Sequence, residues 1–183
     1  QAGDDIYGDS QTDSDYFGES VSLSSDGSRV AIGATAGGRI DNPGYVKIFN
    51  YNSATASWTQ VGNTINGEAN GDAFGKTISL SSDGSRVAIG AILNDENGNY
   101  SGHVRIYDYN SATASWTQVG GDIDGEAERD FCGRTVSLSS DGSRVAIGAD
   151  GNDRTGNARI YEYNSNSNSW SQLGDAIDGE AEN

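Results

Sequence analysis

The feature that most constrains this chain is a fourteen-residue stretch that occurs three times with few changes. It runs from Val21 to Ala34 as VSLSSDGSRVAIGA and returns at 78–91 and 136–149. In each copy, apolar residues alternate with small or polar ones on both sides of an Asp-Gly pair. Such a pair between alternating runs is typical of a β-hairpin, because glycine accepts the positive φ that a tight turn needs. Each copy is therefore predicted to be a hairpin.

The spacing of the hairpins predicts the architecture. The turn aspartates Asp26, Asp83 and Asp141 lie 57 and 58 residues apart, a period typical of propeller blades or other repeat arrays. Alignment of the copies gives four strand-like pieces per unit, and no segment has the periodicity of an amphipathic helix. We expect an all-β chain of the β-propeller type, with four-stranded antiparallel blades. A meandering sandwich is the alternative, but it does not need such faithful copies.

The units are expected to form one continuous repeat domain of three blades plus an extra N-terminal strand. The predicted blades span 16–72, 73–130 and 131–183, and residues 1–15 are the terminal strand of a preceding unit. This follows because residues 1–8 match 118–125 and 172–179, the ends of the second and third units. The last unit keeps its own tail, so the spare edge belongs either to a longer array or to pairing with another copy.

Charge limits the partners. The net charge is −16, which disfavours nucleic acid, whose binding depends on Lys and Arg contacts to phosphate. No apolar run is long enough for a transmembrane helix, so we expect no membrane insertion.

The single cysteine, Cys132, cannot form a disulfide within the chain. The chain begins at Gln1 and has no methionine, and we therefore expect it to be processed or excised from something longer.

Two short motifs carry a family resemblance. Phe17-Gly18 is followed by Ile32-Gly33-Ala34, and the pair returns as Phe74-Gly75 with 89–91, whereas the third unit has Cys132-Gly133 with 147–149. This pattern resembles the FG-GAP repeats of integrin-α-type β-propellers, and the hairpin turns are also WD40-like. The resemblance implies an extracellular adhesion or interaction module. Many such repeats bind calcium between the two motifs, but here one carboxylate in a tight turn cannot supply the six to eight oxygens that calcium prefers.

A different loop supplies the candidate metal ligands. The segment between the second and third strands of the second unit is rich in oxygen donors, and the third unit repeats part of it. Asx-turns explain such sequences without a metal. No cofactor is otherwise expected, and calcium is the one ion for which the sequence offers candidates. They are Asn94, Asp95, Asn97, Asn152 and Asp153.

Other distinctive residues have structural interpretations. The tryptophans at 58, 116 and 170 are expected between blades, with stacking on sugars as the alternative. The aspartates at 15, 72 and 130 are expected to accept hydrogen bonds from backbone N–H groups. The lone His103 is expected at the surface, and Cys132 is expected to fill the small apolar site that phenylalanine fills in the other units.

These observations favour a non-catalytic function. Residues that break the repeat symmetry show no coherent catalytic chemistry, so we do not expect an enzyme. The chain is predicted to be an extracellular or cell-surface repeat module for adhesion, with a protein or glycan ligand. It is also a candidate homo-oligomer, because the unpaired edge strand invites homotypic assembly. Two alternatives stay open: a structural component of a fibre or surface coat, and a scaffold part of a larger propeller enzyme.

Overall fold

The computed structural model describes residues 3–8, 15–36, 41–151 and 155–180. These residues form three antiparallel sheets, each with the strand order of a blade, and they contain no α-helix. The first sheet holds β1 (Ser20–Leu23), β2 (Arg29–Ala34), β3 (Tyr45–Asn52), β4 (Ser57–Gln60) and β5 (Ile65–Asn66). The second holds β6 (Phe74–Leu80), β7 (Arg86–Ala91), β8 (His103–Asn110), β9 (Ser115–Gln118) and β10 (Ile123–Asp124). The third holds β11 (Thr135–Leu138), β12 (Arg144–Ala149), β13 (Asn157–Asn164), β14 (Ser169–Gln172) and β15 (Ile177–Asp178).

The expected all-β fold with four-stranded blades is confirmed, with one difference. The outer strand of each blade is broken into two short pieces, which pair with the two ends of the same third strand. In the first blade, β4 pairs with the end of β3 and β5 pairs with its start. The first residue of the gap still bonds its own sheet, as the Val61 N–H does at the Ile48 carbonyl oxygen, and the chain then leaves the sheet. In the first two blades this segment contacts the next blade. The expected unit boundaries at 15, 72 and 130 stay predictions.

The hairpin turn is built by one aspartate. In the first blade, Asp26 Oδ1 accepts hydrogen bonds from the Ser28 backbone N–H at 2.9 Å and from the Ser24 hydroxyl at 2.7 Å. Gly27 follows with a φ of +69°, the conformation that favours glycine. These bonds favour the ionised form and lower the pKa of Asp26 to about 2. Asp83 and Asp141 repeat the arrangement. The repeated stretch is therefore a turn that builds the blade.

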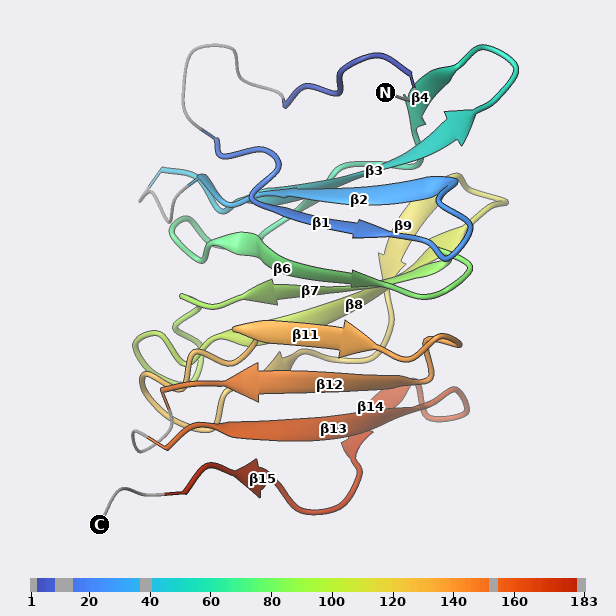
Figure 1. Ribbon diagram of the computed structural model, residues 1–183. Helices are drawn as coiled ribbons and strands as arrows, with labels where there is room; N and C mark the ends of the chain where they lie inside the picture. Colours follow the sequence, from blue (N-terminus) through green and yellow to red (C-terminus); the bar gives the residue numbers. More distant parts are fainter. Residues whose placement is uncertain (1–2, 9–14, 37–40, 152–154, 181–183) are drawn as a thin grey trace.

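The core lies between blades. The three sheets are stacked in sequence order, so that the first and third blades form the two ends of the stack (Figure 1). Apolar side chains of the first two blades share one cluster, which includes Val46, Ile48, Phe74 and Ile89. A second cluster joins the second and third blades around Val104, Ile106 and Ile147. One sheet cannot cover both of its own faces, so the blades must stack. Burial of apolar surface between them stabilises the fold by about 25 cal/mol per Å².

Trp116 and Trp170 lie between blades, as expected, whereas Trp58 packs on Val30, Ile32 and Phe49 of its own blade. The indole N–H of Trp116 donates to the Val61 carbonyl oxygen at 2.9 Å, and that of Trp170 donates to the Val119 carbonyl oxygen at 3.0 Å. In both cases the acceptor lies in the gap of the preceding blade's broken outer strand. The outer strand is therefore interrupted where its backbone contacts the next blade.

The expected N-terminal strand within residues 1–15 stays a prediction, because much of that range lies outside the described residues. Residues 3–8 have no assigned strand. Gly3 lies against Trp58 as Gly62 lies against Trp116, and Ile6 packs on the cluster of Val30, Ile32 and Phe49. In the complete blades, the last segment of each unit forms a strand by pairing with the third strand of the same blade, as β5 does with β3. No third strand precedes residues 3–8 within the described part of the chain.

Candidate functional site

Two blade faces are uncovered within the described residues. On the first blade, Val21 is 63% exposed and Leu23 is 59% exposed. Their counterparts on the second blade are partly buried or buried, and Leu80 is only 7% exposed because it packs on the first blade. At the other end of the stack, Ile177 is 63% exposed, whereas its counterpart Ile123 is 5% exposed beneath the third blade. We call these the first-blade face and the third-blade face.

The third-blade face carries a hollow of about 500 Å³, lined by residues that include Thr135, Gly148, Ala158 and Ile177. Gly90 is the counterpart of Gly148 in the second blade. A Cβ built at Gly90 would lie 2.5 Å from the Gly133 carbonyl oxygen of the third blade. The hollow at Gly148 is therefore the place where the backbone of a following blade would lie.

Hydrogen bonds across blades repeat in register. Thr77 Oγ1 of the second blade donates to the Gly133 carbonyl oxygen of the third at 2.7 Å. At the preceding boundary, Ser20 Oγ of the first blade donates to the Gly75 carbonyl oxygen of the second at 2.6 Å. Thr135 is the third-blade counterpart, and its hydroxyl has no partner among the described residues. The third-blade face thus keeps the donor that joins the other blades.

The first arginine of each central strand forms a second set of repeated contacts. Arg29 and Arg86 each donate through Nη1 at 2.8 Å to a turn carbonyl of the next blade, at Gly84 and Gly142 respectively. The Arg86 guanidinium also lies 4.5 Å from the centre of the Tyr163 ring of that blade. The guanidinium of Arg144, the third-blade counterpart, bonds only Glu162 of its own sheet within the described chain.

A separate polar site surrounds His103. The expectation that this histidine lies at the surface is wrong: it is 1% exposed at the start of β8. Burial follows from its register, because His103 pairs with Ala91 of the central strand β7 on one side and with Asp124 of β10 on the other. Neither ring nitrogen has a hydrogen-bond partner among the residues that the structure describes. Buried polar groups are normally paired, so an unpaired imidazole needs an explanation.

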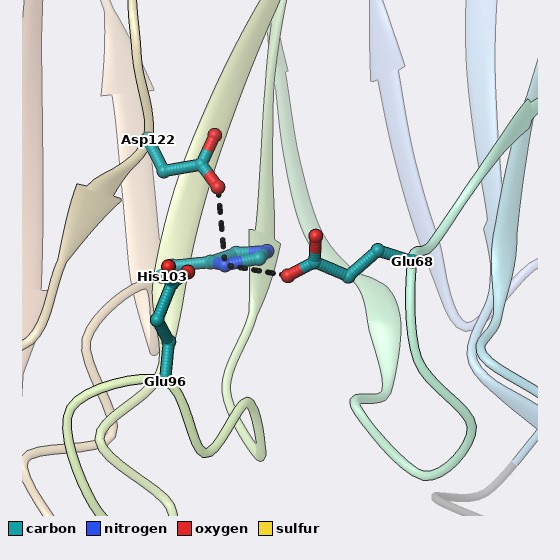
Figure 2. Close-up of side chains that lie close together, drawn as sticks. All are labelled: Glu68, Glu96, His103 and Asp122. Carbon is teal, nitrogen blue, oxygen red and sulfur yellow. Dashed lines mark ion pairs between the residues drawn. The ribbon is translucent and has the colours of Figure 1, made fainter.

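Three carboxylates surround this ring (Figure 2). His103 Nδ1 lies 3.8 Å from Glu68 Oε1 and 3.9 Å from Asp122 Oδ2. Glu96 completes the group, in which one ligand atom from each residue lies within 4.8 Å of the others. Figure 2 shows the ring between Asp122 and Glu68, with Glu96 beside it. We call Glu68, Glu96, His103 and Asp122 the His103 cluster.

Arg105 partly neutralises this cluster. Its Nε and Nη2 donate to the two oxygens of Asp122 at 2.9 and 2.6 Å, and Nη2 also bonds Glu68 Oε2. Burial and the Arg105 charge lower the pKa of His103 to about 4, and the Asp122 and Glu68 carboxylates oppose this shift. The imidazole is therefore neutral at physiological pH, with one nitrogen lone pair free to accept a proton or a metal ion.

The cluster breaks the repeat symmetry. The pair of Arg105 with Glu68 recurs as Arg159 with Glu126, whose atoms lie 2.6 Å apart, so it belongs to the repeat. The positions of His103 and Asp122 hold other residues elsewhere: Tyr45 and Thr64 in the first unit, Asn157 and Ala176 in the third. Sequence comparison between units could have singled out these positions, but it could not show that they meet.

The three described calcium candidates, Asn94, Asp95 and Asn97, are engaged in hydrogen bonds within and beyond their loop. Asn94 is buried; its amide donates to Glu68 and Asp72 at 3.1 Å, and its Oδ1 accepts from the Glu96 backbone. Asp95 Oδ1 accepts from the Tyr100 N–H at 2.7 Å, and Asn97 donates to the Gly125 carbonyl. Asn152 and Asp153 lie outside the described residues. Calcium at these positions stays a prediction, and the Asx-turn interpretation accounts for the contacts at Asn94.

Two further structural expectations are confirmed. Asp15 and Asp130 accept bonds from backbone N–H groups, at Phe17 and Glu126 respectively, whereas Asp72 accepts from the Asn94 side chain. Cys132 is buried in the apolar cluster between the second and third blades. Burial raises the pKa of its thiol to about 12, which makes it inert at neutral pH.

Comparison with known proteins agrees with this architecture. Residues 58–107 match the model of the FG-GAP repeat family. This segment runs from the outer strand of the first blade to the third strand of the second, and it contains Phe74-Gly75 and the 89–91 motif that suggested the resemblance. No curated protein matches the chain. No described helix is long and apolar enough to cross a membrane.

Solved structures share the fold at low identity. A candidate 6-phosphogluconolactonase from Bacteroides fragilis is 17% identical with a TM-score of 0.60, covering 87% of this chain and 38% of its own. Sqt1 from Chaetomium thermophilum is 15% identical with a TM-score of 0.59, covering 91% and 37%. The β-propeller domain of the trilobed protease from Pyrococcus furiosus, described as having an open velcro topology, is 14% identical with a TM-score of 0.50, covering 88% and 42%.

This chain spans about two fifths of the length of these structures, and identities this low show the fold alone. The strand order, the stacking and the sequence match agree with one another. The chain is a β-propeller-type repeat protein in which residues 58–107 match the FG-GAP repeat family.

Proposed function

We propose that this chain is a non-catalytic interaction module that binds another blade of its own kind, supplied by a second copy of the chain. One observation carries the proposal: the third-blade face and the first-blade face are the two halves of an interface that already occurs twice in the molecule. Each half exposes the apolar side chains that its counterparts bury. Head-to-tail contact between two copies would bury both faces.

The polar groups support the same pairing. In the register of the existing interfaces, Thr135 of one copy would donate to the Gly18 carbonyl of the other, as Thr77 does to Gly133. Arg144 would reach the Gly27 carbonyl and lie over the Tyr51–Trp58 ring pair, as Arg86 does at Gly142 and Tyr163. Two copies would bring together six blades, a number within the usual range of four to eight for closed propellers.

Residues 3–8 overlap with the proposed interface. Residues 3–8 lie at Trp58 in the place that the tail of a preceding blade takes at Trp116 and Trp170. In the dimer, residues 172–179 of the other copy would need this place, so residues 3–8 would have to leave it. The first eight residues therefore act as a competitor for the interface, and their removal should strengthen association.

The wider setting belongs to the proposal. The FG-GAP match supports an extracellular or cell-surface location and a role in adhesion to a protein or glycan ligand. A non-catalytic role is consistent with turn aspartates that are occupied in hydrogen bonds and with a cysteine that is buried. The interface is heterologous, so copies that do not close into a ring would extend into a filament, as in the fibre or coat alternative.

Sedimentation velocity across a wide concentration range tests the proposal. We expect the 19.1 kDa chain to give a concentration-dependent species of twice that mass, and a chain lacking residues 1–8 to form it at lower concentration. Growth beyond the dimer, seen as filaments by electron microscopy, would favour the fibre alternative. Strictly monomeric behaviour of both chains, with folded circular dichroism spectra, would overturn self-association.

Two matched variants locate the contact. Leu23→Lys places a charge on the first-blade face, at a side chain that is already 59% exposed, so folding should be unaffected. Ser111→Lys adds the same charge in an exposed loop between β8 and β9, away from both faces. The first variant should be monomeric at all concentrations and the second should associate like the unaltered chain. Equal association of both variants would rule out the first-blade face.

A further inference from the structure

We propose that the His103 cluster binds one divalent transition-metal ion, with Zn²⁺ as the expected occupant. The first support is the histidine itself. Its ring is almost completely buried, its two nitrogens have no hydrogen-bond partner within the described part of the chain, and Nδ1 faces the carboxylates of Glu68 and Asp122. An unpaired polar atom in a core costs stability, and an ion bound to Nδ1 would give that nitrogen a partner.

The distances suit ligands of one ion better than hydrogen bonds. The separations of 3.8 and 3.9 Å from Nδ1 to the two carboxylate oxygens are too long for hydrogen bonds. Two ligands of a tetrahedral zinc, each about 2.0–2.1 Å from the metal, lie roughly 3.3 Å apart. A contraction of about half an ångström would therefore bring these atoms into a zinc coordination shell.

The charges also favour a dication. Three carboxylates and one guanidinium, that of Arg105, lie around a neutral imidazole, which leaves two negative charges uncompensated in the cluster. Glu68 and Glu96 are exposed and Asp122 is partly so, which leaves an entry path for an ion on the carboxylate side. A divalent cation would cancel the remaining charge without rearranging the ion pairs of Arg105.

The ligand types select the class of metal. Imidazole nitrogen with carboxylate oxygen suits zinc and its first-row neighbours, whereas calcium and magnesium prefer oxygen ligands only. This separates the cluster from the calcium candidates in the adjacent loop. Groups around the carboxylates hold them in place: Gln118 donates to Asp122 at 2.6 Å, and Asn94 donates to Glu68 at 3.1 Å. Such outer contacts orient metal ligands in proteins.

The site has a structural consequence. Glu68 lies between β5 of the first blade and β6 of the second, whereas the other three residues belong to the second blade. One ion would therefore join the tail of the first blade to the second, at a single boundary of the stack. The symmetry-breaking residues His103 and Asp122 confine the site to this boundary.

Isothermal titration of the chelator-treated, full 183-residue chain with ZnCl₂ tests the proposal. We expect one Zn²⁺ per chain, and CaCl₂ in excess should not compete. Because His103 is the one histidine of the chain, its ¹⁵N-labelled ring gives one pair of nitrogen signals, and Zn²⁺ should shift the Nδ1 signal strongly. The NMR readout is specific, because binding at scattered surface carboxylates would leave this signal in place.

Variants taken from the chain's own repeats supply the controls. His103→Asn copies the third unit and Glu68→Gln removes one ligand charge; each should weaken Zn²⁺ binding at least about tenfold. Glu126→Gln removes the equivalent carboxylate at Arg159, outside the cluster, and should bind Zn²⁺ like the unaltered chain. Circular dichroism checks folding, and if His103→Asn fails to fold, Asp122→Thr, which copies the first unit, takes its place. An unchanged Nδ1 signal at saturating Zn²⁺, or equal affinity in all variants, would overturn the proposal.

Discussion

The indole N–H of Trp116 donates to the backbone carbonyl oxygen of Val61 at 2.9 Å, across the boundary between the first and second blades. The bond is made possible by the break in the outer strand between β4 and β5, which frees the Val61 carbonyl from its own sheet. The same relationship joins Trp170 to Val119 at the next boundary. A polar contact is thus repeated within an otherwise apolar interface.

Replacing this tryptophan tests how much the polar contact contributes. Trp116→Phe keeps an aromatic ring but leaves the Val61 carbonyl unpaired, and we expect it to lower the free energy of unfolding by about 1–3 kcal/mol. Trp170→Phe should cost less, because Trp170 is only half-buried. Urea denaturation followed by tryptophan fluorescence and circular dichroism measures both. A larger loss at Trp170 would contradict this account of the interface.

A glycine at the blade contact gives a second prediction. Gly90→Ala would bring a Cβ within 2.5 Å of the Gly133 carbonyl oxygen, a backbone atom that cannot move aside easily. We expect a loss of about 1–3 kcal/mol in unfolding free energy, the usual cost of overpacking. Gly148→Ala, at the uncovered third-blade face, meets only the Thr135 side chain and should cost little.

The Gly148→Ala variant also bears on self-association. Its added methyl group would lie in the hollow that a second copy is proposed to fill. Sedimentation should therefore show a weakened dimer with nearly unchanged monomer stability. A Gly148→Ala chain that is as unstable as Gly90→Ala would show that the cost arises within the blade.

The turn aspartates predict a dependence on pH. Hydrogen bonds to the turn carboxylates lower the pKa values of Asp26 and Asp141 in the folded chain from the ordinary 3.8 to about 2, so these carboxylates stabilise the folded chain. This contribution is complete above about pH 4 and is lost as the pH falls through 2. The urea midpoint of the chain should exceed that of the Asp26→Asn/Asp141→Asn variant at pH 5, and the difference should shrink toward pH 2. A difference that is constant across this range would contradict the assignment.

The buried thiol gives a chemical test of packing. With its pKa raised to about 12 from 9.0, Cys132 in the folded chain carries roughly a thousandfold less thiolate than an exposed cysteine. Iodoacetamide should therefore leave the native chain unmodified at mildly alkaline pH and modify the urea-unfolded chain fully, as mass spectrometry can show. Fast labelling of the native chain would mean that the boundary between the second and third blades opens readily.

Repetition made the fold predictable from the sequence. Three copies of an Asp-Gly hairpin at near-constant spacing indicate one blade per copy, and the alternation of Val30 and Ile32 with small residues indicates strands. The break in the outer strand was missed, because the residues from Val61 to Thr64 differ little in polarity from the strand pieces beside them. The same break recurs at 173–176 in the third blade, which no further blade covers within the described residues, so it belongs to the blade itself and is not marked by residue type.

The His103 cluster could not be predicted for a related reason. A single histidine near a strand start has no partner visible in the sequence, and its three carboxylates come from separate segments up to 54 positions apart (Glu68 to Asp122). Their convergence depends on the register of β8 with β10 and on the stacking of the first two blades. By contrast, Asn94 and its neighbours stood out as an oxygen-rich loop because such a pattern is local.

The broken outer strand also decides where the chain can be divided. Because the carbonyl of Val61 and the backbone of Gly62 contact Trp116 of the second blade, a blade cut out at the ends of its sheet would lack the backbone that receives its own tryptophan. The unit that can be exchanged as a whole therefore runs from the end of β4 to the end of β9, and its ends do not coincide with the ends of a sheet. Duplication or recombination at these offset points would add a blade together with the backbone that receives it, and so lengthen the array without exposing a new tryptophan.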